Sequence, residues 1–270
     1  MNEKVVLVTG GTSGIGEATV EELVGAGACV AFTGRRNDLG EALQNKLGKD
    51  KCLYIEADHS NLADCQRSVE QTVAHFGRLD GLFNNAGIVL LERTAEQTSE
   101  EEWEQVMNLN VTAVWRMSKA ALPHLRRSVA SSSTSAIVNN ASDWGLVGGR
   151  EAAAYCTSKG AVVQMTRAMA LDHAKEGVRI NAVCPGDTFV KRWLQRDRHM
   201  VVSPEEEEEG GQKVEDEEVE RRLRVSHEIP MGRVGDAKEV ARVVVFLLNG
   251  ELSSFMTGVC LPVDGGNTAQ

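Results

Sequence analysis

The sequence predicts a single α/β domain in which a parallel sheet of about seven strands carries helices on both faces. Short apolar runs alternate with helix-like segments along the 270 residues, and this order is typical of parallel strands joined by crossover helices. The first apolar run ends in a glycine-rich turn that leads directly into a helix. The length also suits one large domain better than two small ones.

The first strand and helix enclose a turn suited to phosphate. Val5–Val8 is fully apolar, as a strand buried on both faces should be, and a helix-like segment spans residues 17–26. Glycines let a backbone approach a ligand closely, and the free N–H groups at a helix start attract phosphate. This is a Rossmann-type unit, and a glycine-rich turn without a ligand is the alternative. The residues predicted to bind a dinucleotide here are Gly10, Thr12, Ser13, Gly14, Ile15 and Gly16.

The second strand, predicted at residues 29–33, is followed by Gly34, Arg35 and Arg36. In a dinucleotide fold the end of this strand meets the adenosine ribose. An acid there binds the 2′-hydroxyl of NAD, whereas arginine accepts the 2′-phosphate of NADP. The two arginines favour NADP, with NAD as the alternative, although arginines at a strand end are also common as ordinary surface residues.

The alternation continues to the end of the chain, because apolar runs bounded by turn residues recur at similar intervals. Residues 131–135 are polar and are expected to form a loop. The further strands are expected at residues 52–57, 81–84, 136–138, 178–184 and 258–263. The further helices are expected at residues 38–47, 62–76, 99–109, 111–126, 152–174 and 236–248.

Tyr155 and Lys159 are the candidate chemical centre. On a helix their i,i+4 spacing places the phenol and the ammonium on one face, about a turn apart. Because a neighbouring cation favours the phenolate, we expect Lys159 to lower the pKa of Tyr155 toward neutral pH. Ser142 follows the predicted strand 136–138, which would deliver its hydroxyl to the sheet edge. Taken alone, the pair could also be a surface tyrosine packed under a lysine stem.

Further short motifs stand at fixed places along nearly the whole chain. They are Thr9-Gly10-x-x-x-Gly14-x-Gly16, Asp58, Asn84-Asn85-Ala86-Gly87, Asn110, Ser142, Tyr155-x-x-x-Lys159, Asn181, Pro185-Gly186 and Asp264-Gly265-Gly266. Together they resemble the short, single-domain subclass of the short-chain dehydrogenases/reductases. The resemblance implies an NAD(P)(H)-dependent oxidoreductase that interconverts a secondary alcohol and a ketone by direct hydride transfer, with no metal.

The same resemblance assigns roles to single residues. Ser142, Tyr155, Lys159 and Asn110 would be catalytic, with Asn110 holding a water that links Lys159 to solvent. Asp58 would bind the adenine amino group beside the backbone of His59, and Lys159 would also bind the nicotinamide ribose. The other implied cofactor contacts are Asn85, Ala86, Gly87, Pro185, Gly186 and Thr188, the last a substitute for the threonine that many relatives have at the position of Val190.

Composition limits the partners and the compartment. No stretch approaches the roughly 18 apolar residues of a membrane span, so we expect a cytoplasmic protein without a membrane partner. Six isolated cysteines and no paired histidines predict reduced thiols and no metal site. The net charge of −10 argues against a nucleic-acid partner.

The acidity is concentrated in residues 203–229, where eleven acidic and four basic residues give a local charge of −7. We expect residues 187–229 to be an insertion that forms a lid over the substrate. Its glutamates at 205–209 repel one another and should stay in water, and a disordered insertion over 205–212 is the alternative. The residues predicted to line the substrate pocket are Asp143, Trp144 and Trp193, with Leu146 and Arg150 at its edge.

The predicted function is therefore that of an alcohol dehydrogenase or ketone reductase acting on a small molecule. Steroid, sugar, polyol, terpenoid and acyl-carrier substrates are all compatible with the sequence. A catalytically inactive dinucleotide-binding regulatory or scaffold protein is the alternative, and the complete set of Ser142, Asn110, Tyr155 and Lys159 argues against it. By resemblance, the last strand and the helix after Tyr155 would assemble a homotetramer, or a homodimer.

Overall fold

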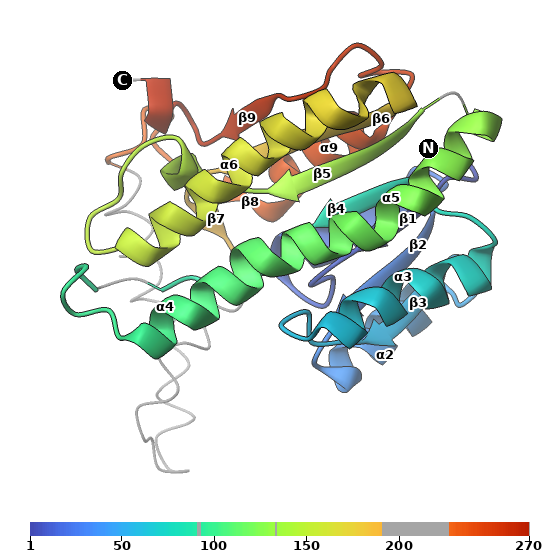
Figure 1. Ribbon diagram of the computed structural model, residues 1–270, viewed down its shortest axis with the longest axis horizontal. Coiled ribbons are helices and arrows are strands. Elements are labelled where there is room, and N and C mark those ends of the chain that lie inside the picture. The colour runs from blue at the N-terminus through green and yellow to red at the C-terminus, as the bar shows by residue number, and fades with distance from the viewer. Residues whose placement is uncertain (91–92, 133, 191–226, 270) are drawn as a thin grey trace.

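The computed structural model describes residues 1–90, 93–132, 134–190 and 227–269. In these residues seven parallel strands form one sheet in the order β3-β2-β1-β4-β5-β6-β9 (Figure 1). This is the doubly wound, Rossmann-type arrangement that the sequence predicts. The strands are β1 Val5–Val8, β2 Cys29–Gly34, β3 Cys52–Glu56, β4 Gly81–Asn84, β5 Ser135–Asn140, β6 Val178–Pro185 and β9 Cys260–Val263.

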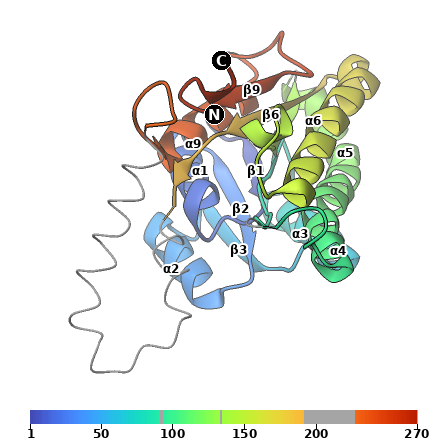
Figure 2. The same ribbon diagram turned by 90° about the vertical axis from the view of Figure 1, so that its left-hand side faces the viewer.

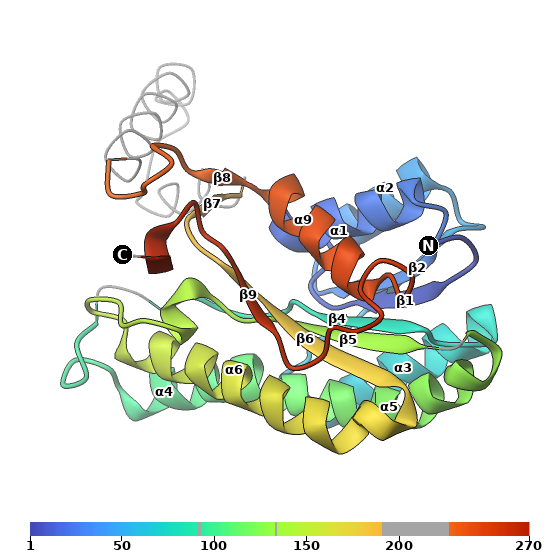
Figure 3. The same ribbon diagram turned by 90° about the horizontal axis from the view of Figure 1, so that it is seen from above.

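Helices cover both faces of the sheet because its strands present apolar side chains on both sides. In β1, Val6 and Val8 belong to one core cluster and Leu7 belongs to another, as alternation along a strand requires. One layer consists of α1 Gly14–Gly25, α2 Asn37–Leu47 and α9 Ala237–Leu248. The opposite layer consists of α3 Leu62–Phe76, α5 Ala113–Ser132 and α6 Ala153–His173, as Figure 3 shows.

The segment between β4 and β5 differs from the prediction. Helix α4, Glu100–Met107, runs through a π-helical turn, Asn108–Thr112, directly into α5, so the two expected helices form one continuous rod. The expected loop at 131–135 is wrong, because α5 reaches Ser132 and Ser135 already pairs with Val178 in the sheet. Serine has only a weak helix preference, and tertiary packing and strand pairing override it here.

Most other boundaries agree with the predictions to within one or two residues. Helix α1 is an exception, since it starts at Gly14 rather than at residue 17. Strand β9 starts at Cys260 rather than at residue 258 because Gly258 has a φ of +78°, outside the strand region.

The expected lid at 187–229 is described only at its two ends. Residues 191–226, with Trp193 and the acidic segment up to 226, lie outside the described part of the chain. The described ends meet in a short parallel pair, β7 Thr188–Phe189 with β8 Gly235–Asp236, which the sequence did not predict. The N–H of Gly235 also donates to the carbonyl of Asp187 (2.9 Å). The segment therefore leaves and re-enters the domain at one place beside the sheet.

Candidate active site

The turn between β1 and α1 passes through two glycines in the left-handed region. Gly10 has a φ of +66° and Gly14 a φ of +58°, conformations that residues with a Cβ rarely adopt. A Cβ on Gly16 would collide with the carbonyl oxygen of Gly10, so Gly16 lets the helix start directly over the turn. The first N–H groups of α1 have no partner within the helix, and the positive end of its dipole lies at the turn.

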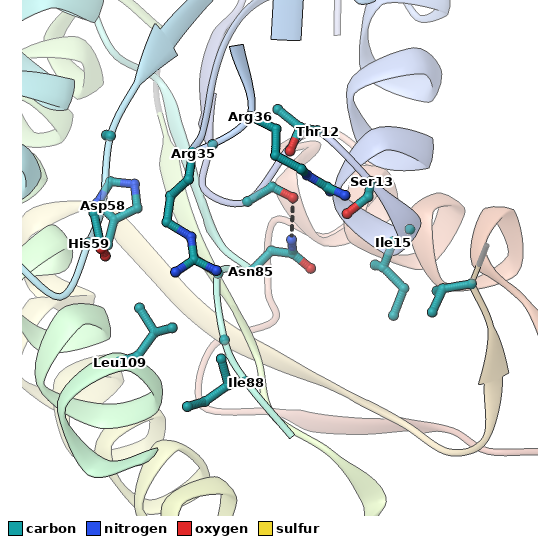
Figure 4. Close-up of a pocket in the computed structure, with 17 residues that line it drawn as sticks. Thr12, Ser13, Ile15, Arg35, Arg36, Asp58, His59, Asn85, Ile88 and Leu109 are labelled. Carbon is teal, nitrogen blue, oxygen red and sulfur yellow. Dashed lines mark hydrogen bonds between the residues drawn. The ribbon is translucent and has the colours of Figure 1, made fainter. Parts of the chain in front are cut away.

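A cavity of about 340 Å³ opens beside this turn at the carboxyl ends of β1 to β4 (Figure 4). Figure 4 shows Arg35 and Arg36 extending over it from the end of β2, with Arg36 directed toward Ser13. Within the described residues neither guanidinium has a hydrogen-bond or ion-pair partner. The predicted cofactor residues that line this cavity are Gly10, Thr12, Ser13, Gly14, Ile15, Arg35, Arg36, Asp58, His59, Asn85, Ala86 and Gly87. Gly16 is buried in the turn and shapes the cavity without lining it.

The residues of this cavity fit a nicotinamide dinucleotide. Helix N–H groups without internal partners suit a pyrophosphate, and the arginines at the end of β2 suit the adenosine ribose region. The glycine turn leaves the backbone within reach of a ligand, since Gly10 and Gly14 carry no side chain into the cavity. The structure thus offers the chemistry that the cofactor requires at each of these points.

Thr9 and Asn85 tie the turn to the loop after β4. The Thr9 hydroxyl accepts hydrogen bonds from the backbone N–H groups of Asn85 and Ala86, both at 2.9 Å. The Asn85 side chain donates to the carbonyls of Thr9 (2.9 Å) and Gly10 (3.1 Å). The dashed line in Figure 4 marks one hydrogen bond of this side chain. Asn140 in turn donates to Asn85 Oδ1 (2.9 Å). These bonds hold the turn at the centre of the sheet edge.

Asp58 and His59 follow β3 at the far end of the cavity. Asp58 Oδ1 accepts the Ser60 N–H (3.0 Å), and His59 Nε2 lies 2.7 Å from Thr33 Oγ1. Burial lowers the pKa of His59 to about 4, although the charges of Asp64 and Asp58 oppose this. The imidazole is therefore neutral at neutral pH.

A second cavity, of about 220 Å³, continues from the first and shares Ile15, Asn85, Gly87, Ile88 and Val190 with it. Its far wall comes from the end of β5, the start of α6 and the loop after β6. The predicted catalytic and cofactor residues that line it are Ser142, Tyr155, Lys159, Pro185, Gly186 and Thr188. Together with the shared Ile15, Asn85 and Gly87, the structure thus brings together predicted site residues that are up to 173 positions apart in the chain, from Ile15 to Thr188.

Lys159 is buried on α6, one turn after Tyr155. Its Nζ donates to the carbonyl of Asn140 (2.8 Å) and lies 5.6 Å from the centre of the Tyr155 ring. Burial lowers the pKa of Lys159 to about 8. The ammonium is thus held beside the tyrosine at a point where its charge is only weakly solvated.

The expectation that Lys159 lowers the pKa of Tyr155 is wrong. Burial raises this pKa to about 12; the hydrogen bond with Ser142 lowers it, and the charge of Asp143 raises it further. The reason is geometric, because the Lys159 ammonium lies over the ring and donates to Asn140 instead of the phenol oxygen. In this structure Tyr155 is a protonated phenol, ready to act as an acid.

Asn110 lies in the π-helical turn and is buried. Its side chain accepts the Ile88 N–H (2.8 Å) and donates to the Ile88 carbonyl (2.9 Å) and to Ser158 Oγ (3.1 Å). A Cβ on Gly87 would come within 3.0 Å of Asn110 Oδ1 and 3.8 Å of Lys159 Nζ. Asn110 therefore stands behind the second cavity and holds the loop after β4 against α6.

The substrate side of the second cavity includes Asp143 and Trp144, as predicted. Leu146 and Arg150 do not line it, because the 3₁₀ turn Asp143–Gly145 directs the chain away from the cavity. Leu146 packs instead against the core beneath α6, and Arg150 is exposed.

Several residues that line the cavities were not among the predicted site residues, and four of them show why. Asn140 ends β5 and accepts the Lys159 hydrogen bond, and its place at the carboxyl end of a strand was a usable signal. Ile88 and Val190 are apolar and carry no chemical signature. Asp187 follows Pro185-Gly186 directly, and its proximity to that motif could have indicated it.

Among the described residues, no helix has the length and apolar character needed to cross a membrane, and no three His, Cys, Asp or Glu side chains gather where they could hold a metal ion.

The chain matches two family models. The model described as "short chain dehydrogenase" matches residues 4–199, and the one described as "Enoyl-(Acyl carrier protein) reductase" matches residues 207–268. Among curated proteins, meso-2,3-butanediol dehydrogenase of Serratia marcescens is 35% identical over 99% of this chain and 96% of that protein. L-fucose dehydrogenase of Mus musculus is 35% identical over 97% of this chain and 88% of that protein. A 2,5-dichloro-2,5-cyclohexadiene-1,4-diol dehydrogenase of Sphingobium indicum is 37% identical over 100% and 98%.

Solved structures agree with these matches. The 3-ketoacyl-(acyl-carrier-protein) reductase from Brucella melitensis, complexed with NADH, superposes with a TM-score of 0.85 at 29% identity, covering 99% of each chain. ElxO with NADP bound superposes with a TM-score of 0.84 at 28% identity, covering 99% of this chain and all of that one. The fold is thus shared with one protein solved with NADH and with another solved with NADP.

Proposed function

The chain belongs to the short-chain dehydrogenase family, and from this we propose that it interconverts a secondary alcohol and a ketone with a nicotinamide dinucleotide, using Tyr155 as the acid and base. One observation carries the proposal. Ser142, Tyr155 and Lys159 share one wall of a cavity that continues into a second one suited to a dinucleotide. A catalytically inactive scaffold would not require these three side chains to lie together beside a dinucleotide site.

When bound, the nicotinamide ring supplies the two-electron chemistry. The Tyr155 phenol exchanges the proton of the substrate oxygen, and Ser142 orients that oxygen beside it. The Lys159 ammonium, which donates to the Asn140 carbonyl at the end of β5, would bind the nicotinamide ribose. Asn110 keeps the loop after β4 in place behind them, and Asp58 and His59 would receive the adenine.

We propose NADP as the preferred dinucleotide. Two features support it: Arg35 and Arg36 extend over the cavity, and the residue at the end of β2 is Gly34 rather than an acid. Figure 4 shows the Arg36 guanidinium beside Ser13, and a guanidinium next to a hydroxyl suits a phosphate with several acceptor oxygens.

For the substrate we propose a small hydroxylated molecule. The related enzymes are named for a butanediol, a sugar and a cyclic diol. The second cavity, at about 220 Å³, is of a size for such compounds and combines Trp144 and Val89 with polar groups. An aromatic side chain and a few oriented polar groups are typical of small-molecule sites.

The proposal extends to the whole chain as one domain with residues 187–229 as the substrate lid. Support comes from β7 and β8, which join the two ends of that segment beside Thr188 in the cavity wall. We further propose a cytoplasmic homotetramer, or a homodimer, as the working form. All six cysteines are free thiols, which suits a reducing compartment.

Tyr155→Phe tests the proposed reaction. The change removes only the phenol O–H, so turnover should fall roughly 100-fold or more while NADPH binding persists. Tyr54→Phe, at the chain's other tyrosine, is the matched control and should keep its turnover because Tyr54 lines neither cavity. Nicotinamide absorbance over a panel of diols, sugars and ketones gives the rates. Near-normal turnover of Tyr155→Phe would show that another group moves the proton.

A further inference from the structure

Asp143 is a buried carboxylate beside the reacting groups. Only 5% of it is exposed, yet it lines the same cavity as Ser142 and Tyr155. Ser142 Oγ donates to Asp143 Oδ1 at 2.9 Å, and the Trp144 N–H donates to the same oxygen at 2.8 Å. Asn267 Nδ2, from the C-terminal segment, donates to Oδ2 at 2.9 Å. The carboxylate is therefore rigidly held from both sides.

This carboxylate has one acceptor position left. A carboxylate offers about four lone-pair positions, and three donors from the described residues occupy positions on Asp143: the Ser142 hydroxyl, the Trp144 N–H and the Asn267 amide. No lysine, arginine or histidine of the described residues forms an ion pair with it, and Lys159 donates to Asn140 instead. A buried anion in this state stabilises a ligand that brings a hydrogen-bond donor.

The place of the free acceptor position identifies the donor. Ser142 and Trp144 both donate to Asp143 Oδ1 and only Asn267 donates to Oδ2, so the free position belongs to Oδ2. Ser142 Oγ lies 2.9 Å from Oδ1 of the same carboxylate, so this position is close to the hydroxyl that orients the reacting oxygen, and two oxygens on neighbouring carbons in a gauche arrangement lie about 3 Å apart. A diol whose reacting oxygen lies at Ser142 and Tyr155 therefore places its second oxygen beside Asp143. Because an ionised carboxylate only accepts hydrogen bonds, that second oxygen must be a hydroxyl.

We propose that Asp143 is a specificity-determining residue that binds the second hydroxyl of a vicinal diol, so that the enzyme interconverts vicinal diols and α-hydroxyketones. This rests on the proposed function and names its substrate class. In the reduction of an α-hydroxyketone, the dinucleotide would supply a hydrogen with its electron pair to the carbonyl carbon. The protonated Tyr155 phenol gives its proton to the carbonyl oxygen as the C=O bond becomes C–O–H, and the phenolate that remains takes up a proton from solvent. The second hydroxyl keeps its proton, which it shares with Asp143 throughout.

The charges around the cavity agree with a neutral polyol. Asp143 and Asp187 both raise the pKa of Tyr155, so their negative charge reaches the reacting group. An anionic substrate would meet this repulsion in a poorly solvated space. Phosphorylated or carboxylated alcohols are therefore disfavoured relative to uncharged diols and sugars.

The test compares three substrates that differ in one group: 2,3-butanediol, its mono-O-methyl ether and 2-butanol. The ether keeps the second oxygen but removes its proton. In the wild type, kcat/KM for the diol should exceed that for the ether and for 2-butanol by roughly 10- to 100-fold, the range of a hydrogen bond to a charged group. Asp143→Asn keeps an acceptor for Ser142 and Trp144, and should lower the diol preference at least tenfold.

Asp187→Asn is the matched control, since it removes a charge from the same cavity without touching the Ser142 hydrogen bond. It should leave the diol-to-ether ratio close to the wild-type value. Equal loss of this ratio in both variants would mean that the net charge of the cavity, and not an acceptor at Asp143, sets selectivity. If Asp143→Asn lowers kcat/KM for all three substrates by the same factor, Asp143 only positions Ser142. Either result overturns the proposal, as does a preference for 1-amino-2-propanol over the diol.

Calorimetric binding separates this proposal from the proposed reaction. In the Tyr155→Phe background, loaded with the dinucleotide, the diol should bind more tightly than the ether, and adding Asp143→Asn should abolish that difference. Equal binding of the two ligands before Asp143 is changed overturns the assignment, whatever the turnover shows. Undiminished turnover in Tyr155→Phe, by contrast, contradicts only the acid–base role of the tyrosine.

Discussion

Burial governs the ionisation of the groups that line the two cavities. Tyr155 and Lys159 move in opposite directions, with pKa values of about 12 and about 8, because burial disfavours the charged form of each. His59 follows the same rule with a pKa of about 4. At neutral pH the tyrosine and histidine are therefore neutral, and Lys159 supplies the positive charge beside the phenol.

His59 should make the protein less stable in acid. The unfolded chain protonates this histidine below its ordinary pKa near 6.5, whereas the folded chain does so only near pH 4. Between these pH values the unfolded state binds one more proton than the folded state. The contribution of His59 to the free energy of unfolding is therefore fully present above about pH 6.5 and is lost as the pH falls toward 4, by roughly 3 kcal/mol at most. Urea unfolding of wild type and His59→Gln across this window measures the contribution as a difference. Parallel pH dependences in the two proteins would show that His59 is not responsible.

Arg35 should determine which dinucleotide binds. Arg35→Ala is expected to weaken NADPH binding by roughly 10- to 100-fold, because a charge-assisted hydrogen bond to phosphate is lost, and to affect NADH little. Fluorescence titration with each dinucleotide gives both dissociation constants. Arg150→Ala, at an exposed arginine outside both cavities, is the control. Equal weakening of both dinucleotides, or a wild-type preference for NADH, would contradict the assignment.

Single turns and caps decide where several elements begin and end. The π-helical turn between α4 and α5 carries Asn110 and so sets its distance from Ile88 and Ser158. Such turns are frequent at functional sites because the extra residue re-aims a side chain. Asp236 closes β8 and also caps α9, where it forms a capping box with Glu239. Asp236 therefore connects β8, which follows the segment 187–229, directly to helix α9.

Loss of this cap should destabilise the fold measurably. Asp236 Oδ1 accepts the Lys238 N–H (2.7 Å), and Glu239 Oε2 accepts the Asp236 N–H (2.8 Å). Asp236→Ala should cost about 1 kcal/mol of unfolding free energy, whereas Asp236→Asn keeps a side-chain acceptor and should cost much less. Urea titration followed by circular dichroism provides both values. A loss of similar size in the two variants would place the effect in the charge of Asp236 and not in its cap.

The surface of the molecule carries apolar side chains at one end of the sheet. Figure 2 shows β9 at one end of the sheet and β3 at the other. Next to β9, Phe255 is fully exposed and Leu252 is largely so, and Leu171 at the end of α6 is also exposed. An unpaired edge strand with apolar neighbours is a surface that a second copy can cover.

We expect light scattering to give about 117 kDa, four times the chain mass of 29.3 kDa, as for a closed symmetric homotetramer. Phe255→Asp should convert it to a smaller species because a charge would be buried in the contact. Leu39→Asp is the matched control, since Leu39 lies on α2, near the opposite end of the sheet, and is also exposed. A mass near 29 kDa for the wild type at micromolar concentration would exclude the assembly.

Local patterns were sufficient wherever one short segment carries the information. The apolar run Val5–Val8, the glycines of the following turn and the Tyr155/Lys159 spacing are all properties of neighbours in the chain. These patterns were sufficient to predict a doubly wound parallel sheet, the dinucleotide site and the residues proposed for catalysis. Strand alternation and glycine placement are properties of a few neighbouring residues, so they can be recognised in the sequence. The bounds of α3 and β4 were predicted to the residue for the same reason.

Only the tertiary structure decided features that depend on partners distant in the chain. The pairing of β7 with β8 joins Thr188 to Gly235, and Asn267 reaches Asp143 across 124 positions. The direction of the Tyr155 pKa shift follows from burial and from where the Lys159 ammonium points, neither of which is visible in a spacing of four residues. Hydrogen-bond partners and desolvation are set by which surfaces meet, and that is a property of the folded chain alone.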